Sequence, residues 1–193
     1  MIKQYKGMLG EFEYDTEEYT ILKYSEVLRY IGDGKDIRLP RGCISCNRMF
    51  ESTKLRKLDL SNFDTTGVLD MSRMFYLAEN LEELDLSNFN TESVTRMEYM
   101  FGHCNSLKVL ELSQFNTERL QDCSLMIKHC ENLRCINLGT IGSNIPLSYD
   151  FFAGCNRLCY IQTEKASWKV DGYTAIGYIS DTKCGVLRND TEI

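Results

Sequence analysis

Apolar residues alternate with polar ones in a short segment that recurs along the chain. Two near-identical copies, "LRKLDLSNFDT" and "LEELDLSNFNT", begin at Leu55 and Leu81. Three more divergent copies begin at Leu107 ("LKVLELSQFNT"), Leu133 ("LRCINLGTI") and Leu158 ("LCYIQTE"). The leading leucines are therefore 26, 26, 26 and 25 residues apart. A fixed period of this length indicates a repeat architecture, in which each copy forms one structural unit.

The alternation itself predicts a strand in each copy. Leu58 and Leu60 are separated by one polar residue, and so are the corresponding leucines of the next two copies. Residues two apart in a strand point to the same face, so these leucines should face a core while the residues between them face outward. We expect the strands to stack as rungs of one parallel sheet. Apolar residues should fill the core at the corner after each strand, namely Phe63, Phe89, Phe115 and Ile141.

The second half of each repeat has apolar residues at spacings of three and four. It reads Val-x-x-Met-x-x-Met-Phe in two copies, and threonines or an acidic residue precede it. This spacing places the apolar side chains on one stripe of a helix, and the preceding polar residues suit N-terminal capping. We therefore expect one helix per repeat with these residues turned inward: Val68, Met71, Met74, Phe75; Val94, Met97, Met100, Phe101; and Leu120, Cys123, Met126, Ile127.

Strand, corner, helix and return together form one turn of a solenoid, and one turn alone cannot bury its apolar face. The expected fold is an α/β solenoid, a leucine-rich repeat with a parallel concave sheet, convex helices and about five rungs, forming one structural domain. Residues 37–162 would form the repeats and residues 1–36 an N-terminal cap. Short apolar runs broken by Gly and Asp in "SWKVDGYTAIGYISDTKCGVL" predict a C-terminal β cap over residues 163–193.

Composition limits the classes of partner. The 193 residues include 28 acidic and 22 basic side chains, and the net charge of −6 disfavours nucleic acid and anionic membranes. No apolar run is long enough for a signal-peptide core or a membrane-spanning helix. Nine cysteines cannot all pair within one chain, so we expect a reducing compartment. A complete chain would be cytoplasmic, whereas a fragment of an exported protein would lie at the cell surface or be secreted.

The segments "LDLSNFDT", "DMSRMF" and "CNSLKVLELS" together closely resemble the BspA-like leucine-rich repeats of bacterial surface proteins. The similarity is close in two repeats and fair in two more, and it covers roughly residues 37–162. It implies a solenoid that recognises other macromolecules, often host or matrix proteins in exported members, and it implies no catalytic residue. The chain differs from usual members in showing no export signal or wall-anchoring segment.

Cys43 and Cys46 form the only C-x-x-C motif, a spacing compatible with zinc or redox chemistry. A zinc site would need two more ligands, and the two cysteines share the repeat positions of Val68 and Met71. Packing in the core is therefore the favoured interpretation.

The other cysteines fall into two groups. Cys104, Cys130 and Cys155 occupy one repeat position together with Ala78, and a column of small apolar residues explains them. The remaining three, Cys135, Cys159 and Cys184, show no spacing typical of a site, and Cys135 is expected to be exposed and reactive.

Histidines, serines and glycines show no catalytic arrangement. His103 and His129 occupy one repeat position just before the cysteine column and are expected in a surface turn. No Ser–His–acid or Cys–His order is recognisable, and no glycine loop has a phosphate-binding pattern. We therefore expect no enzyme activity, no cofactor and no bound metal.

Residues between the strand leucines should align across the rungs and form the exposed face of the sheet. The first column contains Asp59, Asp85, Glu111, Asn137 and Gln162, and the second contains Lys57, Glu83, Val109, Cys135 and Tyr160. A third contains Ser61, Ser87, Ser113, Gly139 and Glu164. At the ~4.8 Å spacing of strands, neighbouring carboxylates repel by about 1 kcal/mol even in water.

Two interpretations of the acidic column are open. In one, Glu83, Asp85 and Glu111 form the centre of an acidic patch that docks a basic protein surface, and Val109, Cys135 and Tyr160 supply an anchoring contact. In the other, the repeat consensus carries acids there for solubility or local hydrogen bonding.

The ten residues of the first two columns are thus the candidate partner-binding site of a non-catalytic module that recognises a protein. One alternative is a structural spacer or scaffold for a neighbouring domain. Another is an exported adhesin fragment that binds host or matrix protein. An enzyme or metal protein would require the cysteines to leave their packing positions.

Overall fold

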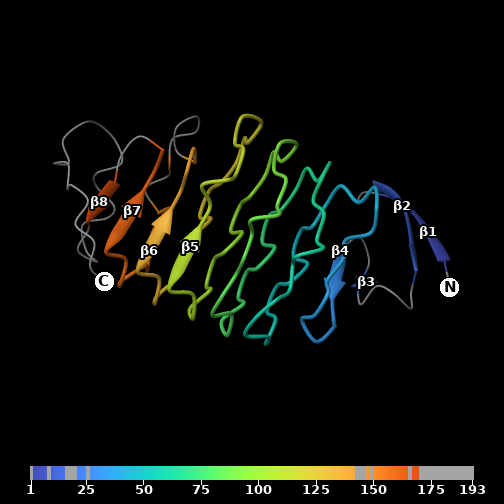
Figure 1. Ribbon diagram of the computed structural model, residues 1–193, viewed down its shortest axis with the longest axis horizontal. Coiled ribbons are helices and arrows are strands. Elements are labelled where there is room, and N and C mark those ends of the chain that lie inside the picture. The colour runs from blue at the N-terminus through green and yellow to red at the C-terminus, as the bar shows by residue number, and fades with distance from the viewer. Residues whose placement is uncertain are drawn as a thin grey trace.

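The computed structural model describes residues 2–7, 10–15, 21–24, 27–141, 147, 150–164 and 167–169. The chain forms an elongated stack of coils, where a coil is one repeat-length turn of the chain, and the N-terminal strands lie at one end of the stack (Figure 1). Backbone hydrogen bonds join successive coils, between positions that are equivalent or one repeat position apart. The Phe75 amide, for example, donates to the Met100 carbonyl at 2.9 Å, and the Phe101 amide donates to the Met126 carbonyl at 2.9 Å.

The described residues contain no helix, so the expected fold class, an α/β solenoid with convex helices, is wrong. The segments expected to be helical are consecutive turns. Some of their amides donate to carbonyls within the same turn, and others donate to carbonyls of the next coil. The Met74 amide donates to the carbonyl of Met71 in its own turn at 3.2 Å, whereas the next amide, that of Phe75, donates to the next coil. In a helix, every interior amide would donate to its own chain four residues back.

Left-handed backbone conformations keep these turns from merging into a helix. Arg73 and Leu77 have φ angles of 57° and 58°. Equivalent left-handed pairs occur in the other coils, namely Arg48 with Ser52, Tyr99 with His103, and Leu125 with His129. A right-handed helix requires negative φ throughout. Apolar spacings of three and four fit such turns as well as they fit a helix, so the pattern alone did not distinguish the two.

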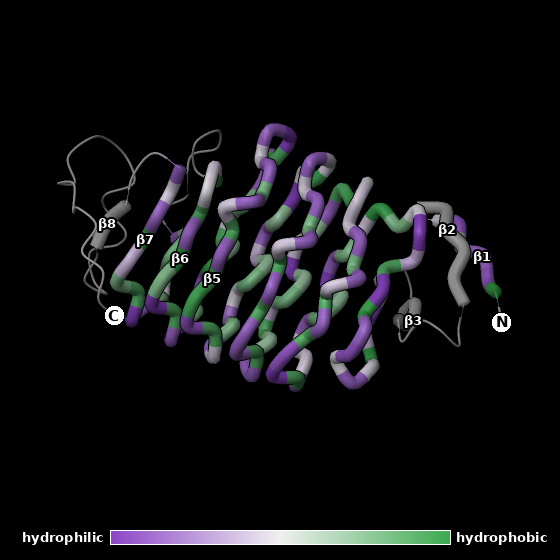
Figure 2. Tube along the Cα trace, viewed as in Figure 1, coloured by the Kyte–Doolittle hydropathy of each residue, from purple (hydrophilic) through white to green (hydrophobic). Residues whose placement is uncertain are grey.

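The inward direction expected for the apolar stripe is confirmed. Val68, Met71, Met74 and Phe75 are all buried, as are their counterparts in the next two repeats. Figure 2 shows hydrophobic and hydrophilic residues alternating along the coils of the stack.

The parallel sheet is shorter than expected. Strands β5 (Val109–Glu111), β6 (Cys135–Asn137) and β7 (Tyr160–Gln162) pair in parallel, and β8 (Ser167–Lys169) pairs antiparallel with β7. Residues 57–60 and 83–86 form no strand, so the expected sheet of about five rungs is also wrong. The leucine alternation nevertheless holds there, because Leu58, Leu60 and Leu86 are buried and Leu84 packs partly buried against the same core. Single parallel bridges join the coils on a second side, through Ser45, Asp70, Arg96 and Asp122.

Stacking places like side chains above one another in the core. The rings of Phe50 and Phe75 stack with centroids 5.3 Å apart, and those of Phe75 and Phe101 stack at 5.6 Å. The corner residues Phe63, Phe89 and Phe115 form a second ladder. Buried threonines link the coils with hydrogen bonds. Thr65 Oγ1 donates to the Asn90 carbonyl at 2.9 Å and accepts from the Asn90 amide at 2.8 Å, which satisfies polar groups that burial would otherwise penalise.

Two antiparallel hairpins lie within the segment expected to form the N-terminal cap. They pair β1 (Ile2–Gly7) with β2 (Gly10–Asp15), and β3 (Ile21–Tyr24) with β4 (Val27–Tyr30). The amide of Tyr30 donates to the Met49 carbonyl at 2.9 Å, and its ring lies 5.4 Å from that of Phe50. Residues 170–193, most of the expected C-terminal cap, and Cys184 lie outside the described residues. Capping therefore stays a prediction at both ends.

Candidate functional site

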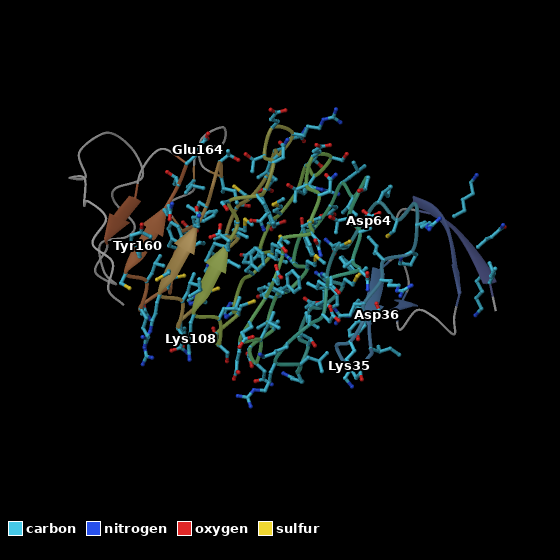
Figure 3. The ribbon with its side chains drawn as sticks, viewed as in Figure 1. Lys35, Asp36, Asp64, Lys108, Tyr160 and Glu164 are labelled. Carbon is cyan, nitrogen blue, oxygen red and sulfur yellow. The ribbon has the colours of Figure 1, made fainter. Side chains whose placement is uncertain are left out.

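The strands β5, β6 and β7 bring two of the expected columns into register. Val109 pairs with Cys135, which pairs with Tyr160, and two residues further on Glu111, Asn137 and Gln162 lie side by side. The strand face denotes these six residues and their counterparts in the two preceding coils: Lys57, Asp59, Glu83 and Asp85. Tyr160 marks the β7 end of this face in Figure 3.

Lysine neutralises one of the three acids of the expected patch. Lys57 Nζ donates to Glu83 Oε2 across neighbouring coils, and Arg56 forms the same kind of pair with Glu82. The Lys57 and Glu83 side chains are 64% and 70% exposed, so this ion pair contributes little to stability. Glu83 is thus a paired side chain and not the centre of a free acidic patch.

The first column of the strand face has a structural role in the chain's own turns. Each of its first four members accepts a hydrogen bond from the amide two residues further on: Asp59 from Ser61 at 3.1 Å, Asp85 from Ser87 at 2.9 Å, Glu111 from Ser113 at 2.9 Å and Asn137 from Gly139 at 3.2 Å. This is the Asx-type turn favoured by Asp and Asn, and here it redirects the chain after the extended segment. Local hydrogen bonding, the second interpretation of the column, therefore accounts for acids at this repeat position.

The same contacts favour the ionised form of two of these carboxyl groups, those of Asp59 and Asp85. The hydroxyl and then the amide of Ser61 lower the pKa of Asp59, and the amide of Ser87 lowers the pKa of Asp85. Asn137 Nδ2 also donates to Glu111 Oε2 at 3.2 Å. Among the described residues, neither Asp85 nor Glu111 forms an ion pair.

An open groove of about 860 Å³ lies along the middle of the strand face. It is lined by Asp85, Val109 and Glu111 of the two columns. Residues outside the columns also line it: Arg56, Glu82, Leu84, Ser106, Lys108 and Asn132. Lys108, labelled in Figure 3, immediately precedes β5. Aligning the repeats one position further upstream would have found it, because Arg56, Glu82 and Lys108 occupy one repeat position.

The C-x-x-C motif is part of the core. Cys43 and Cys46 are 2% and 0% exposed, and burial raises the pKa of the Cys43 thiol to about 11. A buried protonated thiol is a poor metal ligand and a poor nucleophile. No group of three His, Cys, Asp or Glu side chains within the described residues is placed to hold a metal ion. The packing interpretation of this motif is confirmed by its burial.

The column of Cys104, Cys130 and Cys155 is likewise buried, beside Ala78. These thiols donate weak hydrogen bonds to carbonyls of the preceding coil, such as that from Cys104 Sγ to the Phe75 oxygen at 3.2 Å. Cys135, in contrast, is half-buried and not fully exposed as expected, and Cys159 is exposed. The spacing of these last two cysteines in the sequence had indicated no site.

His103 and His129 lie in equivalent turns and are partly exposed, in keeping with the expected surface position. Gly154 occupies the next position of the same column. A Cβ atom on Gly154 would lie 2.2 Å from His129 Nδ1, so the imidazole fills the space beside the glycine.

No helix that could cross a membrane is found within the described residues. No curated protein and no solved structure matches the chain. A family model described as "Mycoplasma protein of unknown function, DUF285" matches residues 44–146, which is more than half of the chain and contains the most regular repeats. The chain therefore belongs to the DUF285 family of Mycoplasma proteins of unknown function.

Proposed function

We propose that this chain is a non-catalytic binding module that holds a protein partner on its strand face. One observation carries the proposal: Asp85 and Glu111, both without an ion pair among the described residues, share a groove with the exposed Val109. Val109 is 61% exposed and lies on the same side of β5 as Glu111, two residues away. An exposed aliphatic side chain beside two carboxylates is a combination suited to recognition.

The chemistry of the face defines the partner that would fit. Protein interfaces combine apolar anchors with a polar rim, and a few aromatic or apolar contacts contribute most of the binding free energy. The row of Val109, Cys135 and Tyr160 would take an apolar side chain, and the carboxylates of Asp85 and Glu111 would take a lysine or arginine. The net charge of −6 would favour the approach of a basic segment.

We further propose that the chain is related to the BspA-like repeat proteins of bacterial surfaces. The recurring "LDLSNF" and the "DMSRMF" segment support this relationship, and the proposal does not include the convex helices of the expected fold. For an exported member, the strand face would be the surface that meets host or matrix protein.

The test uses two substitutions that remove charge but keep shape. Asp85→Asn with Glu111→Gln retains oxygen acceptors for the Ser87 and Ser113 amides, so the turns should persist. A partner is first identified from lysate of the producing cells and from a panel of extracellular matrix proteins. The affinity of the purified partner is then measured by titration calorimetry. We expect the double variant to bind at least about tenfold more weakly, because close charge pairs in interfaces are worth about 1.5 kcal/mol or more.

The matched control makes the same chemical change at another site. Asp64 accepts from the Thr66 amide at 2.9 Å in the same type of turn, and Glu118 is exposed. Asp64→Asn with Glu118→Gln therefore changes the net charge equally and should leave affinity unchanged. If both double variants bind the partner as tightly as the wild type does, the partner does not bind through Asp85 and Glu111, and the proposed site on the strand face is wrong.

A spacer is the second candidate function, and the local hydrogen-bonding role of the acidic column favours it. Acids that serve their own turns need no partner to explain them. If the chain is a spacer, neither the cell lysate nor the matrix proteins should yield a partner.

A further inference from the structure

Two thiols in the described part of the chain are not buried, and both lie at the start of neighbouring strands. Cys135 is the first residue of β6, and Cys159 immediately precedes β7. The parallel register pairs Cys135 with Tyr160, so Cys159 lies one residue away from the position directly opposite Cys135.

Hydrogen bonds hold Cys159 against the strand that contains Cys135. The Cys159 amide donates to the Arg134 carbonyl at 2.9 Å, and Cys159 Sγ donates to the same oxygen at 3.2 Å. That carbonyl belongs to the peptide bond that leads into Cys135. Cys159 Sγ, although exposed, therefore lies against the peptide bond between Arg134 and Cys135.

The strand geometry allows a bond between the two sulfur atoms. Neighbouring strands lie ~4.8 Å apart and one residue spans ~3.3 Å, so residues offset by one have Cα atoms about 5.8 Å apart. Disulfides join Cα atoms that are about 4.4 to 6.8 Å apart. The two thiols also interact directly, since burial first and Cys159 second raise the pKa of Cys135.

We propose that Cys135 and Cys159 form a redox-active surface dithiol that closes to a disulfide in the presence of hydrogen peroxide and thereby links β6 to β7. Cys159 is the more exposed sulfur and meets the oxidant first. Its thiolate attacks one peroxide oxygen, the O–O bond breaks, and a sulfenic acid and hydroxide form. The Cys135 sulfur then attacks the sulfenic sulfur, and the hydroxyl group leaves as water. In total, the two thiols lose two electrons and two protons, and one hydrogen peroxide becomes two waters.

The other neighbouring thiols serve as internal controls. Cys130 and Cys155 occupy adjacent coils but are only 1% and 3% exposed. Their sulfurs donate to the carbonyls of Phe101 and Ile127 at 3.0 Å each. Oxidants and alkylating reagents reach buried thiols slowly, so these cysteines should remain free during a short exposure.

Closure of the disulfide would alter the strand face. Cys135 lies between Val109 and Tyr160 in the apolar row. A cross-link there would fix the Cys135 side chain toward Cys159 and change the surface that an apolar anchor meets. This consequence rests on the proposed function, whereas formation of the disulfide does not.

The test begins with the full chain, reduced and folded. It is exposed briefly to hydrogen peroxide, and the remaining thiols are blocked with N-ethylmaleimide in denaturant. Digestion with trypsin without reduction then yields peptide 135–157, which contains Cys135 and Cys155, and peptide 158–165, which contains Cys159. We expect these two peptides to be joined by a disulfide in monomeric protein, with maleimide on Cys155.

Two variants assign the bond, because Cys135 and Cys155 share one peptide. The joined peptides should decrease at least about tenfold in Cys135→Ser and remain in Cys155→Ser, since only an accessible thiol reacts quickly. Cys159→Ser, at an exposed position, should abolish them without affecting folding. The proposal is overturned if the cross-link survives in Cys135→Ser. It is equally overturned if wild-type Cys159 proceeds to sulfinic acid or forms dimers between chains while Cys135 stays free.

Discussion

The imidazole rings of His103 and His129 stack with their centroids 4.8 Å apart, at equivalent positions of neighbouring coils. Both residues have left-handed backbones, with φ of 61° and 58°. Burial and then His129 lower the pKa of His103 below its ordinary value of 6.5. Lys128 acts in the same direction, whereas Glu79 and Glu131 oppose the shift. Stacking of like coils has therefore placed two titratable rings in contact.

This stack should make the fold sensitive to mild acid. Because the pKa of His103 is lower in the folded chain, the unfolded chain binds more protons once the pH falls below 6.5. The contribution of His103 to stability is thus present above that pH and is lost as the pH falls through the folded pKa. We expect the urea midpoint of unfolding to decrease between about pH 7 and about pH 5.

His103→Asn provides the corresponding variant, because Asn tolerates a left-handed backbone better than most residues. The midpoint of this variant should depend less on pH over the same range. A pH dependence identical to that of the wild type would show that the imidazole stack is not its source.

The turn formed by Asp85 should depend mainly on an acceptor atom and to a smaller extent on the carboxylate charge. Asp85→Ala removes the acceptor of the Ser87 amide and should lower the free energy of unfolding by up to about 1 kcal/mol. Asp85→Asn keeps an acceptor and should retain most of that stability at neutral pH. Below the ordinary pKa of 3.8 the stability of the wild type should approach that of Asp85→Asn. The lowered pKa of Asp85 means that the contribution of its charge is lost as acid protonates it. Urea unfolding at two pH values measures both effects.

Inward and outward positions of one segment should respond very differently to truncation. Leu86 is 2% exposed in the core, so Leu86→Ala should cost about 2 to 5 kcal/mol of unfolding free energy. Glu83 is exposed and forms an exposed ion pair with Lys57, so Glu83→Ala should cost less than about 1 kcal/mol. Comparable losses of thermal stability would contradict the assignment of these residues to opposite sides.

The third column, beside the strand face, has a glycine at its fourth position for a steric reason. Gly139 has a φ of 53°, and a Cβ there would lie 2.6 Å from the Ser113 Cα atom in the preceding coil. Gly139→Ala should therefore force two coils apart. Gly67 also has a left-handed φ, of 82°, but no atom lies within 4 Å of an added Cβ.

Gly67→Ala is thus the matched control, since it carries the backbone strain without the clash. We expect Gly139→Ala to lose at least about 1 to 3 kcal/mol more stability than Gly67→Ala. Equal losses would mean that only the left-handed backbone matters and that the coils tolerate separation at this point. Thermal unfolding followed by circular dichroism measures the difference.

Repetition made the interior of this protein predictable. A period of 25 or 26 residues brings each side chain next to its counterpart in the next copy, so the buried positions and the columns followed from alignment of the repeats. The inward stripe of Val68, Met71, Met74 and Phe75 was found in this way although the secondary structure was wrong. Diagonal neighbours were harder to foresee. Cys159 contacts the strand of Cys135 from a different repeat position, and repeat periodicity relates only equivalent positions.

The sequence by itself determined which side chains are buried and which equivalent side chains become neighbours, because burial of apolar surface and a constant repeat length are properties of the residue pattern. Only the tertiary structure decided the path of the backbone between those side chains. The amides of Phe75 and its counterparts donate to carbonyls of the next coil instead of carbonyls in their own turn. These hydrogen bonds can form only when the coils are stacked. Left-handed residues such as Arg73 and Leu77 are compatible with those bonds and incompatible with a helix, so stacking replaced the expected helices with turns.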